Sequence, residues 1–172
     1  MQKHFRLDAL CFAANNIVSN LLPSPQDIEN ENKLFLKDKE GLEKQQGIFL
    51  SAILQNKTEG IHLCKSMLLP LDLAEEKKEE FQNKGKVNFN GASVESFNDY
   101  DLVTINNPDF LNAEDNRTLL PLEAAIDIAI RSKKNDICVL RGSKVTNPKY
   151  KNKNIFGAGI NLTHLYEGKI PF

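Results

Sequence analysis

Three small residues, Gly157-Ala158-Gly159, form the segment with the clearest chemical potential in this sequence. They follow a short apolar run typical of a strand and precede Ile160-Asn161-Leu162, which is typical of a helix start. Small side chains let the backbone approach a ligand closely, and glycine tolerates unusual dihedral angles. Consecutive backbone N–H groups at a helix start can hold an anion or a developing oxyanion. Taken alone, however, such a segment is more often a plain tight turn than a binding site.

Other candidates for chemistry are weaker. His62 and Cys64 have a spacing that metal ligands use, but no second ligand pair follows them in the sequence. The sequence therefore predicts no metal site. His164 comes just after the small-residue turn, and its position favours an exposed place on a helix surface. No Ser-His-Asp or phosphate-loop pattern is found.

The elements that must position the small-residue turn change character along the chain. The first ~80 residues are typical of helices: apolar residues recur at helical spacing from Leu10 to Leu21, and a longer periodic pattern runs from Leu42 to Leu69. Ser24 is expected to cap a helix that has Pro25 at its first position. The charged run at 74–80 is typical of a solvated helix face.

From Lys84-Gly85 onward the pattern favours strands. Residues 87–89, 94–97 and 102–105 are short strand-like runs separated by turn residues, and a helix is predicted from about Thr118 to Ser132 with Pro121 in its first turn. The face predicted for this helix contains Leu119, Leu122, Ile126, Ala129 and Ile130. Ile137 to Leu140 is predicted to be a buried strand. A strand, a helix and a second strand in this order favour a right-handed crossover.

Composition narrows the functional classes. The chain has 172 residues and a formal net charge of −1, so charge alone favours neither nucleic acid nor an anionic membrane as a partner. Its apolar runs are far shorter than the roughly 20 residues that cross a bilayer, which predicts a soluble protein. Cys11, Cys64 and Cys138 each lie among apolar residues, so we expect buried, reduced thiols and a cytoplasmic location.

Ordered blocks of sequence between about residues 20 and 170 carry a resemblance to a known family. The chain resembles the crotonase superfamily and, within it, is most similar to the (3,5-dihydroxyphenyl)acetyl-CoA 1,2-dioxygenase family of glycopeptide-antibiotic pathways. The C-terminal blocks are typical of the superfamily, and the helical N-terminal blocks favour the dioxygenase branch. The blocks are Lys39-Glu40-Gly41, Gln46-Gly47-Ile48-Phe49, residues 62–70, Leu111-Asn112-Ala113-Glu114-Asp115, Leu140-Arg141-Gly142, Asn147-Pro148-Lys149-Tyr150 and residues 156–162.

The resemblance assigns roles to several residues. The backbone N–H of Ile160, presented next to Gly159, would be one donor of the oxyanion hole that holds the thioester carbonyl, and the second donor would come from a later glycine-rich turn. Glu114 would lie near the acyl group, where partial burial would tune its pKa and phenolic hydroxyls could donate to it. A helix N-terminal acid that balances the helix dipole, with Asp115 beside it, is the alternative for Glu114. Residues implied to line the pocket or to contact the CoA substrate are Ala158, Asn161, Leu162, Asn147, Pro148, Lys149, Tyr150 and Lys151.

Lysines accompany the segment that the resemblance places against CoA. Lys144, Lys149, Lys151 and Lys153 could contact phosphates, and a solvated basic loop explains any one of them equally well.

The fold implied is a helical N-terminal domain at 1–84 followed, at 85–172, by the first part of an incomplete crotonase-type β/α spiral. It combines α+β and α/β character. The implied substrate is an acyl-CoA thioester whose enolate reacts directly with O2, with no metal or flavin cofactor and with cleavage of the thioester. A complete enzyme would be a homo-oligomer, either a trimer or a hexamer. An interrupted spiral would expose apolar faces, so we expect the isolated chain to aggregate or to be marginally stable.

Two departures from the family pattern leave the substrate open. Gly157 stands where the family usually has Ser, and Asn147 stands where it usually has His. A crotonase-type hydratase, isomerase or thioesterase would use the same Ile160 donor and remains an alternative. A truncated, inactive chain or an interaction module is another. A generic helical binding protein is disfavoured by the ordered set of blocks.

Overall fold

The computed structural model describes residues 4–151 and 153–170 and divides the chain into two compact units. Unit 1 comprises the chain up to Leu69 together with the residues from Thr163 onward, and unit 2 runs from Pro70 to Leu162. The domain boundary predicted at residue 84 stays a prediction. Among the described residues, no helix combines the length and the apolar character needed to cross a membrane.

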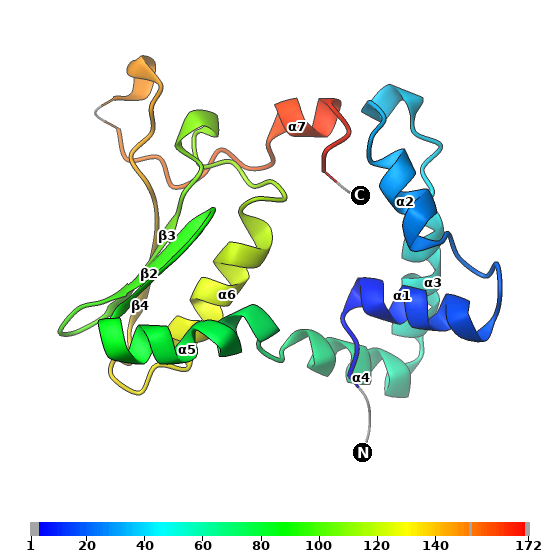
Figure 1. Cartoon of the computed structure of the whole chain (residues 1–172), viewed down its shortest axis with the longest axis horizontal. Helices are drawn as coiled ribbons and strands as arrows, with labels where there is room; N and C mark the ends of the chain where they lie inside the picture. Colours follow the sequence, from blue (N-terminus) through cyan, green and yellow to red (C-terminus); the bar gives the residue numbers. More distant parts are fainter. Residues whose placement is uncertain (1–3, 152, 171–172) are drawn as a thin grey trace. The chain divides into compact units, whose positions relative to one another are not determined.

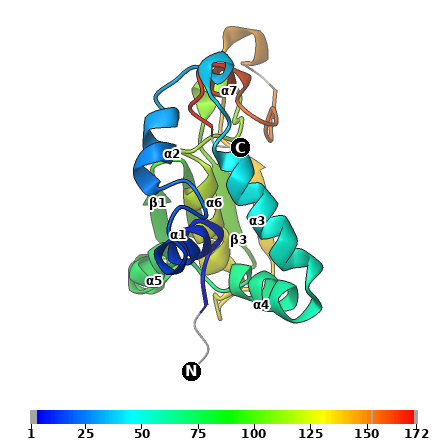
Figure 2. The ribbon, with the colours of Figure 1, turned by 90° about the vertical axis from the view of Figure 1, so that its right-hand side faces the viewer.

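Unit 1 is built from helices, as the periodicity of the first part of the sequence predicts. Its elements are α1 (Leu7–Ile17), α2 (Pro25–Glu31), the 3-10 turn η1 (Leu36–Asp38), α3 (Glu43–Gln55), α4 (Lys57–Met67) and the short α7 (Leu162–Tyr166), which starts at the boundary with unit 2. Figure 2 shows α3 leading almost directly into α4.

Local caps explain where two of these helices begin. The Ser24 hydroxyl accepts a hydrogen bond from the Asp27 N–H at 3.2 Å, with Pro25 at the first helical position, which confirms the predicted cap of α2. Asn56 ends α3 and caps α4, because its side-chain oxygen accepts from the Thr58 N–H at 3.2 Å. One residue thus separates two helices.

A buried carboxylate fixes the turn before α3. Glu31 is 5% exposed, and its two carboxylate oxygens accept hydrogen bonds from the N–H groups of Gly41 at 2.7 Å and Leu42 at 2.9 Å. A carboxylate without such donors would be costly to bury. These two hydrogen bonds to Glu31 therefore hold the backbone at the end of the Lys39-Glu40-Gly41 block in place.

Unit 2 is a small mixed sheet with helices. Its elements are α5 (Asp72–Lys84), β1 (Lys86–Phe89), β2 (Ala92–Ser96), β3 (Asp101–Ile105), η2 (Pro108–Phe110), α6 (Leu119–Ile130), β4 (Cys138–Gly142) and η3 (Pro148–Tyr150). The strands lie in the order β1-β2-β3-β4, with antiparallel pairing up to β3 and a parallel β3–β4 pair (Figure 1). The predicted strand meander and the strand–helix–strand crossover are confirmed. The result is an α+β arrangement, and the larger crotonase-type spiral stays a prediction.

The core of unit 2 lies between one face of the sheet and the helices α5 and α6. Val87, Val94 and Val103 are register partners across three strands and are at most 1% exposed. Small helix residues let α6 approach the sheet closely, since Ala124 and Ala125 are fully buried. Other members of this cluster are Ala74, Phe81, Phe89, Ala92, Ile128 and Ala129.

Three predictions about burial are wrong. β4 is exposed along most of its length, because it is an edge strand paired only with β3 and α6 packs mainly on β2 and β3. Cys138 on β4 and Cys64 on α4 are therefore exposed, and only Cys11 is a buried thiol. The buried face of α6 is also rotated from the predicted one, because Leu119 is 47% and Ile130 71% exposed.

Candidate functional site

The backbone around Ile160 is held by an isolated parallel β-bridge to Glu114. The Glu114 N–H donates to the Gly159 carbonyl at 2.7 Å, and the Asn161 N–H donates to the Glu114 carbonyl at 2.9 Å. Successive N–H groups of an extended segment point in opposite directions, so the Ile160 N–H points away from Glu114. Among residues 4–151 and 153–170 this N–H has no hydrogen-bond acceptor. The bridge thus presents one free, oriented donor.

Gly159 gives the turn before this donor its shape. Its φ of +78° lies in the left-handed region, which an L-residue with a side chain avoids. Nothing lies within 4 Å of the position that a Cβ would take, so space is not the constraint. Dihedral strain alone makes glycine the suitable residue here.

A buried carboxylate, Asp115, supports the bridge from beneath. Asp115 is 1% exposed, and its Oδ2 accepts hydrogen bonds from the side-chain amides of Asn161 at 2.9 Å and Asn107 at 3.0 Å. Its Oδ1 accepts from the Arg117 N–H at 3.0 Å, and the Arg117 guanidinium lies 3.7 Å from Oδ2. This carboxylate therefore links the residue after Ile160 to the loops on either side of Glu114.

The charge of Asp115 is stabilised where it lies. Burial raises the pKa of its carboxyl, but the hydrogen bonds from the Asn161 side chain, the Arg117 N–H and the Asn107 side chain, with the nearby Arg117 charge, outweigh burial and lower the pKa below its usual range. Asp115 is therefore ionised at neutral pH, and its oxygens act only as acceptors.

A second buried amide, Asn112, connects the same loop to the end of β4. Asn112 is fully buried with φ +56°, and its Nδ2 donates to the carbonyls of Ser143 at 2.8 Å and Ile155 at 3.0 Å. Its Oδ1 accepts from the Asn107 N–H at 3.1 Å and the Ser143 hydroxyl at 2.8 Å. Gly142, at the end of β4, lets the chain at Ile155 and Phe156 approach closely, because a Cβ at this position would collide with the carbonyl oxygens of both residues.

The residues predicted to line the acyl pocket lie in different surroundings. Ala158, Ile160 and Leu162 are exposed, whereas Asn161 is 3% exposed and its amide is bonded to Asp115. The Glu114 side chain is exposed, so the predicted partial burial of this carboxylate is wrong. The structure brings Glu114 and Ile160 together through their backbones and leaves the Glu114 side chain accessible.

The segment predicted to contact CoA forms a compact turn. The Asn147 side chain accepts from the Lys149 N–H at 3.0 Å at the start of η3, where Pro148 fits because no N–H is needed. The ammonium groups of Lys149 and Lys153 lie 5.5 Å and 5.8 Å from the centre of the Tyr150 ring. Lys151 is exposed at the end of η3. Contact of this turn with a substrate stays a prediction.

The three histidines belong to unit 1, whereas both residues of the bridge belong to unit 2. His62 stacks on His4 with ring centres 4.8 Å apart, and His4 Nδ1 lies 3.0 Å from the Ser66 hydroxyl. His164 lies on α7 and is half-buried. In the described part of the chain, no group of three or more His, Cys, Asp or Glu side chains is arranged to hold a metal ion.

Sequence reasoning missed most of the polar support beneath the bridge. Asn107, Asn112 and Asn161 were not assigned structural roles, and Asp115 was considered only as a helix-terminal acid. A signal was present, because Asn and Asp occur at six of the eleven positions from 106 to 116, directly after a buried strand. These side chains hydrogen-bond to nearby backbone and tolerate left-handed conformations, which suits an irregular buried loop.

Comparison with known proteins shows similarity to a dioxygenase. No protein-family model matches the chain. The chain is 36% identical over 169 residues to the (3,5-dihydroxyphenyl)acetyl-CoA 1,2-dioxygenase of Amycolatopsis orientalis. The match covers 98% of this chain but only 39% of that relative. The resemblance to a dioxygenase of this kind is therefore confirmed, and membership of the wider crotonase superfamily stays a prediction.

Proposed function

We propose that this chain forms the thioester-binding part of an enzyme that oxygenates an arylacetyl-CoA such as (3,5-dihydroxyphenyl)acetyl-CoA. The observation that carries the proposal is the match to the dioxygenase across 98% of the chain, which includes both Glu114 and Ile160. The free Ile160 N–H supports it independently, because an oriented backbone donor is the group that an acyl-transfer or enolate-forming site needs.

The Ile160 N–H would act on the thioester oxygen. Loss of a proton from the carbon next to the carbonyl places negative charge on that oxygen, and a preorganised donor stabilises the charge without having to reorient. Removing one such donor typically raises the barrier by about 2.7–4 kcal/mol. The resemblance places the second donor in a later turn, so Ile160 would supply half of the stabilisation.

The proposed reaction balances with O2 as its only oxidant. The enolate carbon is oxidised to a ketone, the thioester carbon becomes a carboxylic acid, and CoA leaves as the thiol. Both oxygen atoms of O2 enter the product, and the two hydrogens of the original CH2 are found in the acid and the thiol. One O2 is therefore consumed for each CoA released.

Glu114 would recognise the aryl end of the substrate. Its backbone is fixed by the bridge while its side chain is exposed, so the carboxylate can reach a ligand without breaking an existing structure. A carboxylate accepts hydrogen bonds from phenolic hydroxyls. The exposed tip of the Gly157–Ile160 turn would lie against the thioester.

Two measurements test the proposal. The first is binding of (3,5-dihydroxyphenyl)acetyl-CoA to the 172-residue chain, followed by the amide resonance of Ile160, with Val94 on β2 as a reference amide within unit 2. We expect a saturable shift at Ile160, and an unchanged resonance at saturating thioester would refute the binding role.

The second measurement follows oxygen uptake and CoA release in the protein that results if the reading frame continues past Phe172. Equal molar uptake and release support the oxygenase. Release without uptake would replace it with a thioesterase, and neither would leave a crotonase-type hydratase or isomerase of another substrate.

A further inference from the structure

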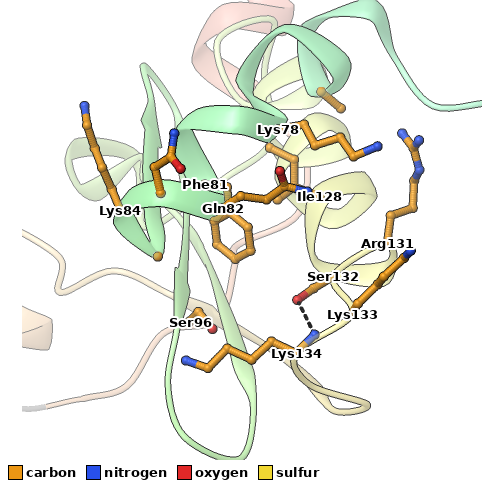
Figure 3. A pocket seen from close by; sticks show the side chains of 13 residues that line it. Lys78, Phe81, Gln82, Lys84, Ser96, Ile128, Arg131, Ser132, Lys133 and Lys134 are labelled. Carbon is orange, nitrogen blue, oxygen red and sulfur yellow. Dashed lines mark hydrogen bonds between the residues drawn. The ribbon is translucent and has the colours of Figure 1, made fainter.

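Unit 2 contains a cavity that none of the predicted thioester contacts line. It has a volume of about 730 Å³ and lies between the C-terminal half of α5, the C-terminal end of α6 and the segments at Gly85 and Ser96. Buried core side chains form its floor, since Phe81 is 7% and Ile128 5% exposed. Figure 3 shows cationic side chains on several sides of Phe81.

The walls of this cavity carry only positive charge. Five of its lining residues are cationic and none is acidic: Lys78, Lys84, Arg131, Lys133 and Lys134. Two carboxylates on α5 offset part of this charge. Glu75 pairs with Arg131 and lies 3.9 Å from Lys78, and Glu80 pairs with Lys84 at 3.1 Å while also binding Lys77.

Two cations remain without a carboxylate partner. Within the described residues, no acidic group lies within 4.0 Å of the ammonium of Lys133 or Lys134. The C-terminal ends of α5 and α6 each carry about −0.5 charge and favour nearby cations. That effect accounts for roughly one of the two unpaired charges, so a positive excess faces the cavity.

The turn that carries Lys133 and Lys134 is anchored. The Asn135 side-chain nitrogen lies 3.2 Å from the Ser96 hydroxyl, 3.0 Å from the Phe97 carbonyl and 2.7 Å from the Asp101 carboxylate. Asp101 is fully buried, so this contact fixes the turn to the core of the sheet. Binding an anion here would order side chains on a backbone that is already placed, which lowers its entropic cost.

We propose that this cavity binds a small molecule with two or more linked phosphate groups. Four of the five cations are lysines, which bind phosphate as point charges, and the fifth is Arg131, whose planar guanidinium also matches phosphate oxygens. The cavity lies in the size range of small-molecule sites rather than along an extended groove.

This cavity is separate from the Glu114–Ile160 bridge. The bridge lies near the start of α6 and the cavity near its end, and a helix of 12 residues is about 18 Å long. The proposal therefore does not depend on the proposed oxygenase, although the pyrophosphate of CoA is one source of the same chemistry and a free polyphosphate is another.

Calorimetric titration of the 172-residue chain with sodium tripolyphosphate at 150 mM salt tests the proposal, with the amide resonances of Gly85 and Ser132 as site reporters. We expect saturable binding that the double variant Lys133→Gln/Lys134→Gln weakens about tenfold. The matched control, Lys57→Gln/Lys65→Gln, removes two exposed lysines from α4 and should leave the affinity unchanged. All four lysines are exposed, so we expect neither double variant to change stability. Thermal midpoints equal to that of the wild type will show that both variants fold.

Two results would overturn the inference. An equal affinity in both double variants would mean that tripolyphosphate binds elsewhere, and an equal affinity for citrate would mean that the cavity does not select phosphate. A CoA titration then distinguishes the sources: shifts at Gly85 and Ser132 would assign the phosphates to a CoA nucleotide, and shifts with tripolyphosphate alone would assign them to a free polyphosphate. Both of these outcomes support the site.

Discussion

The substitution Asp115→Asn tests whether one buried carboxylate holds the Ile160 donor in place. Asp115 accepts hydrogen bonds at Oδ2 from Asn107 and Asn161 and at Oδ1 from the Arg117 N–H. Asparagine keeps one oxygen. If that oxygen takes the Oδ2 position, the new NH2 group faces the Arg117 N–H, and two donors oppose each other.

The magnitude follows from this count. One buried donor without an acceptor costs about 1–3 kcal/mol, and hydrogen bonds to a charged group are at the strong end of the range. We therefore expect Asp115→Asn to lower the free energy of unfolding by about 1–3 kcal/mol. Asp115→Ala removes both oxygens and leaves the Asn107, Asn161 and Arg117 donors without this acceptor, so it should lower the free energy of unfolding further. The matched control is Asp99→Asn, because Asp99 is an exposed aspartate of the same unit and should change stability by less than about 0.5 kcal/mol.

Urea unfolding at pH 7, followed by circular dichroism, measures these differences. A second readout separates positioning from stability: in a folded fraction held well below the transition, Asp115→Asn should shift the amide resonances of Ile160 and Asn161 while leaving Val94 in the sheet unmoved. The reasoning is refuted if Asp115→Asn costs no more than Asp99→Asn, or if the Ile160 resonance does not change.

Three further outcomes are expected. Because the pKa of Asp115 is lowered in the folded state, its stabilising contribution should be complete above the ordinary carboxyl pKa of about 3.9 and should fade as pH falls through the lower folded value. Urea unfolding from pH 7 to pH 2 measures the stability difference between wild type and Asp115→Asn, and this difference should shrink only below about pH 4. Gly159→Ala should cost about 1–2 kcal/mol through its left-handed φ alone, so Gly159→Asn, which tolerates that conformation, should recover part of the loss in the same assay. Gly142→Ala should destabilise the fold by about 1–3 kcal/mol, because the new Cβ would collide with the Ile155 carbonyl. Gly47 lies inside α3 with open space around it, so Gly47→Ala should stabilise the fold by about 0.5–1 kcal/mol. Thermal midpoints that move in the same direction for both variants would contradict the packing argument.

Periodicity predicted most of the elements correctly, because those elements are determined by local patterns. The cap of α2 at Ser24, the strands that follow Gly85 and the placement of Pro121 in the first turn of α6 agree with the structure. The burial of β4 was predicted wrongly. Four apolar residues in a row indicate a strand but do not say how many neighbours that strand has, and β4 has only β3.

The candidate site was only partly predictable for a similar reason. The small residues at 157–159 predicted the turn, and the family resemblance implied roles for Ile160 and Glu114 that stay predictions. The bonds that hold them connect residues 46 positions apart, as between Asp115 and Asn161, and 43 apart, as between Asn112 and Ile155. Asparagine and aspartate are common in exposed turns, so composition alone did not show that these side chains were buried.

The sequence by itself determined the helices, the strands, the glycine turn and the relationship to a thioester oxygenase, because dihedral preferences, hydrophobic spacing and short motifs act over a few residues. Only the tertiary structure decided that the Ile160 N–H has no acceptor within the part of the chain that the structure describes, that Asp115 is buried beside it and that five cations line one cavity. These three properties depend on which distant segments meet. The burial of a residue, the hydrogen bonds it makes and the charge around it all depend on its neighbours in space. A local sequence pattern does not show which distant residues those neighbours are.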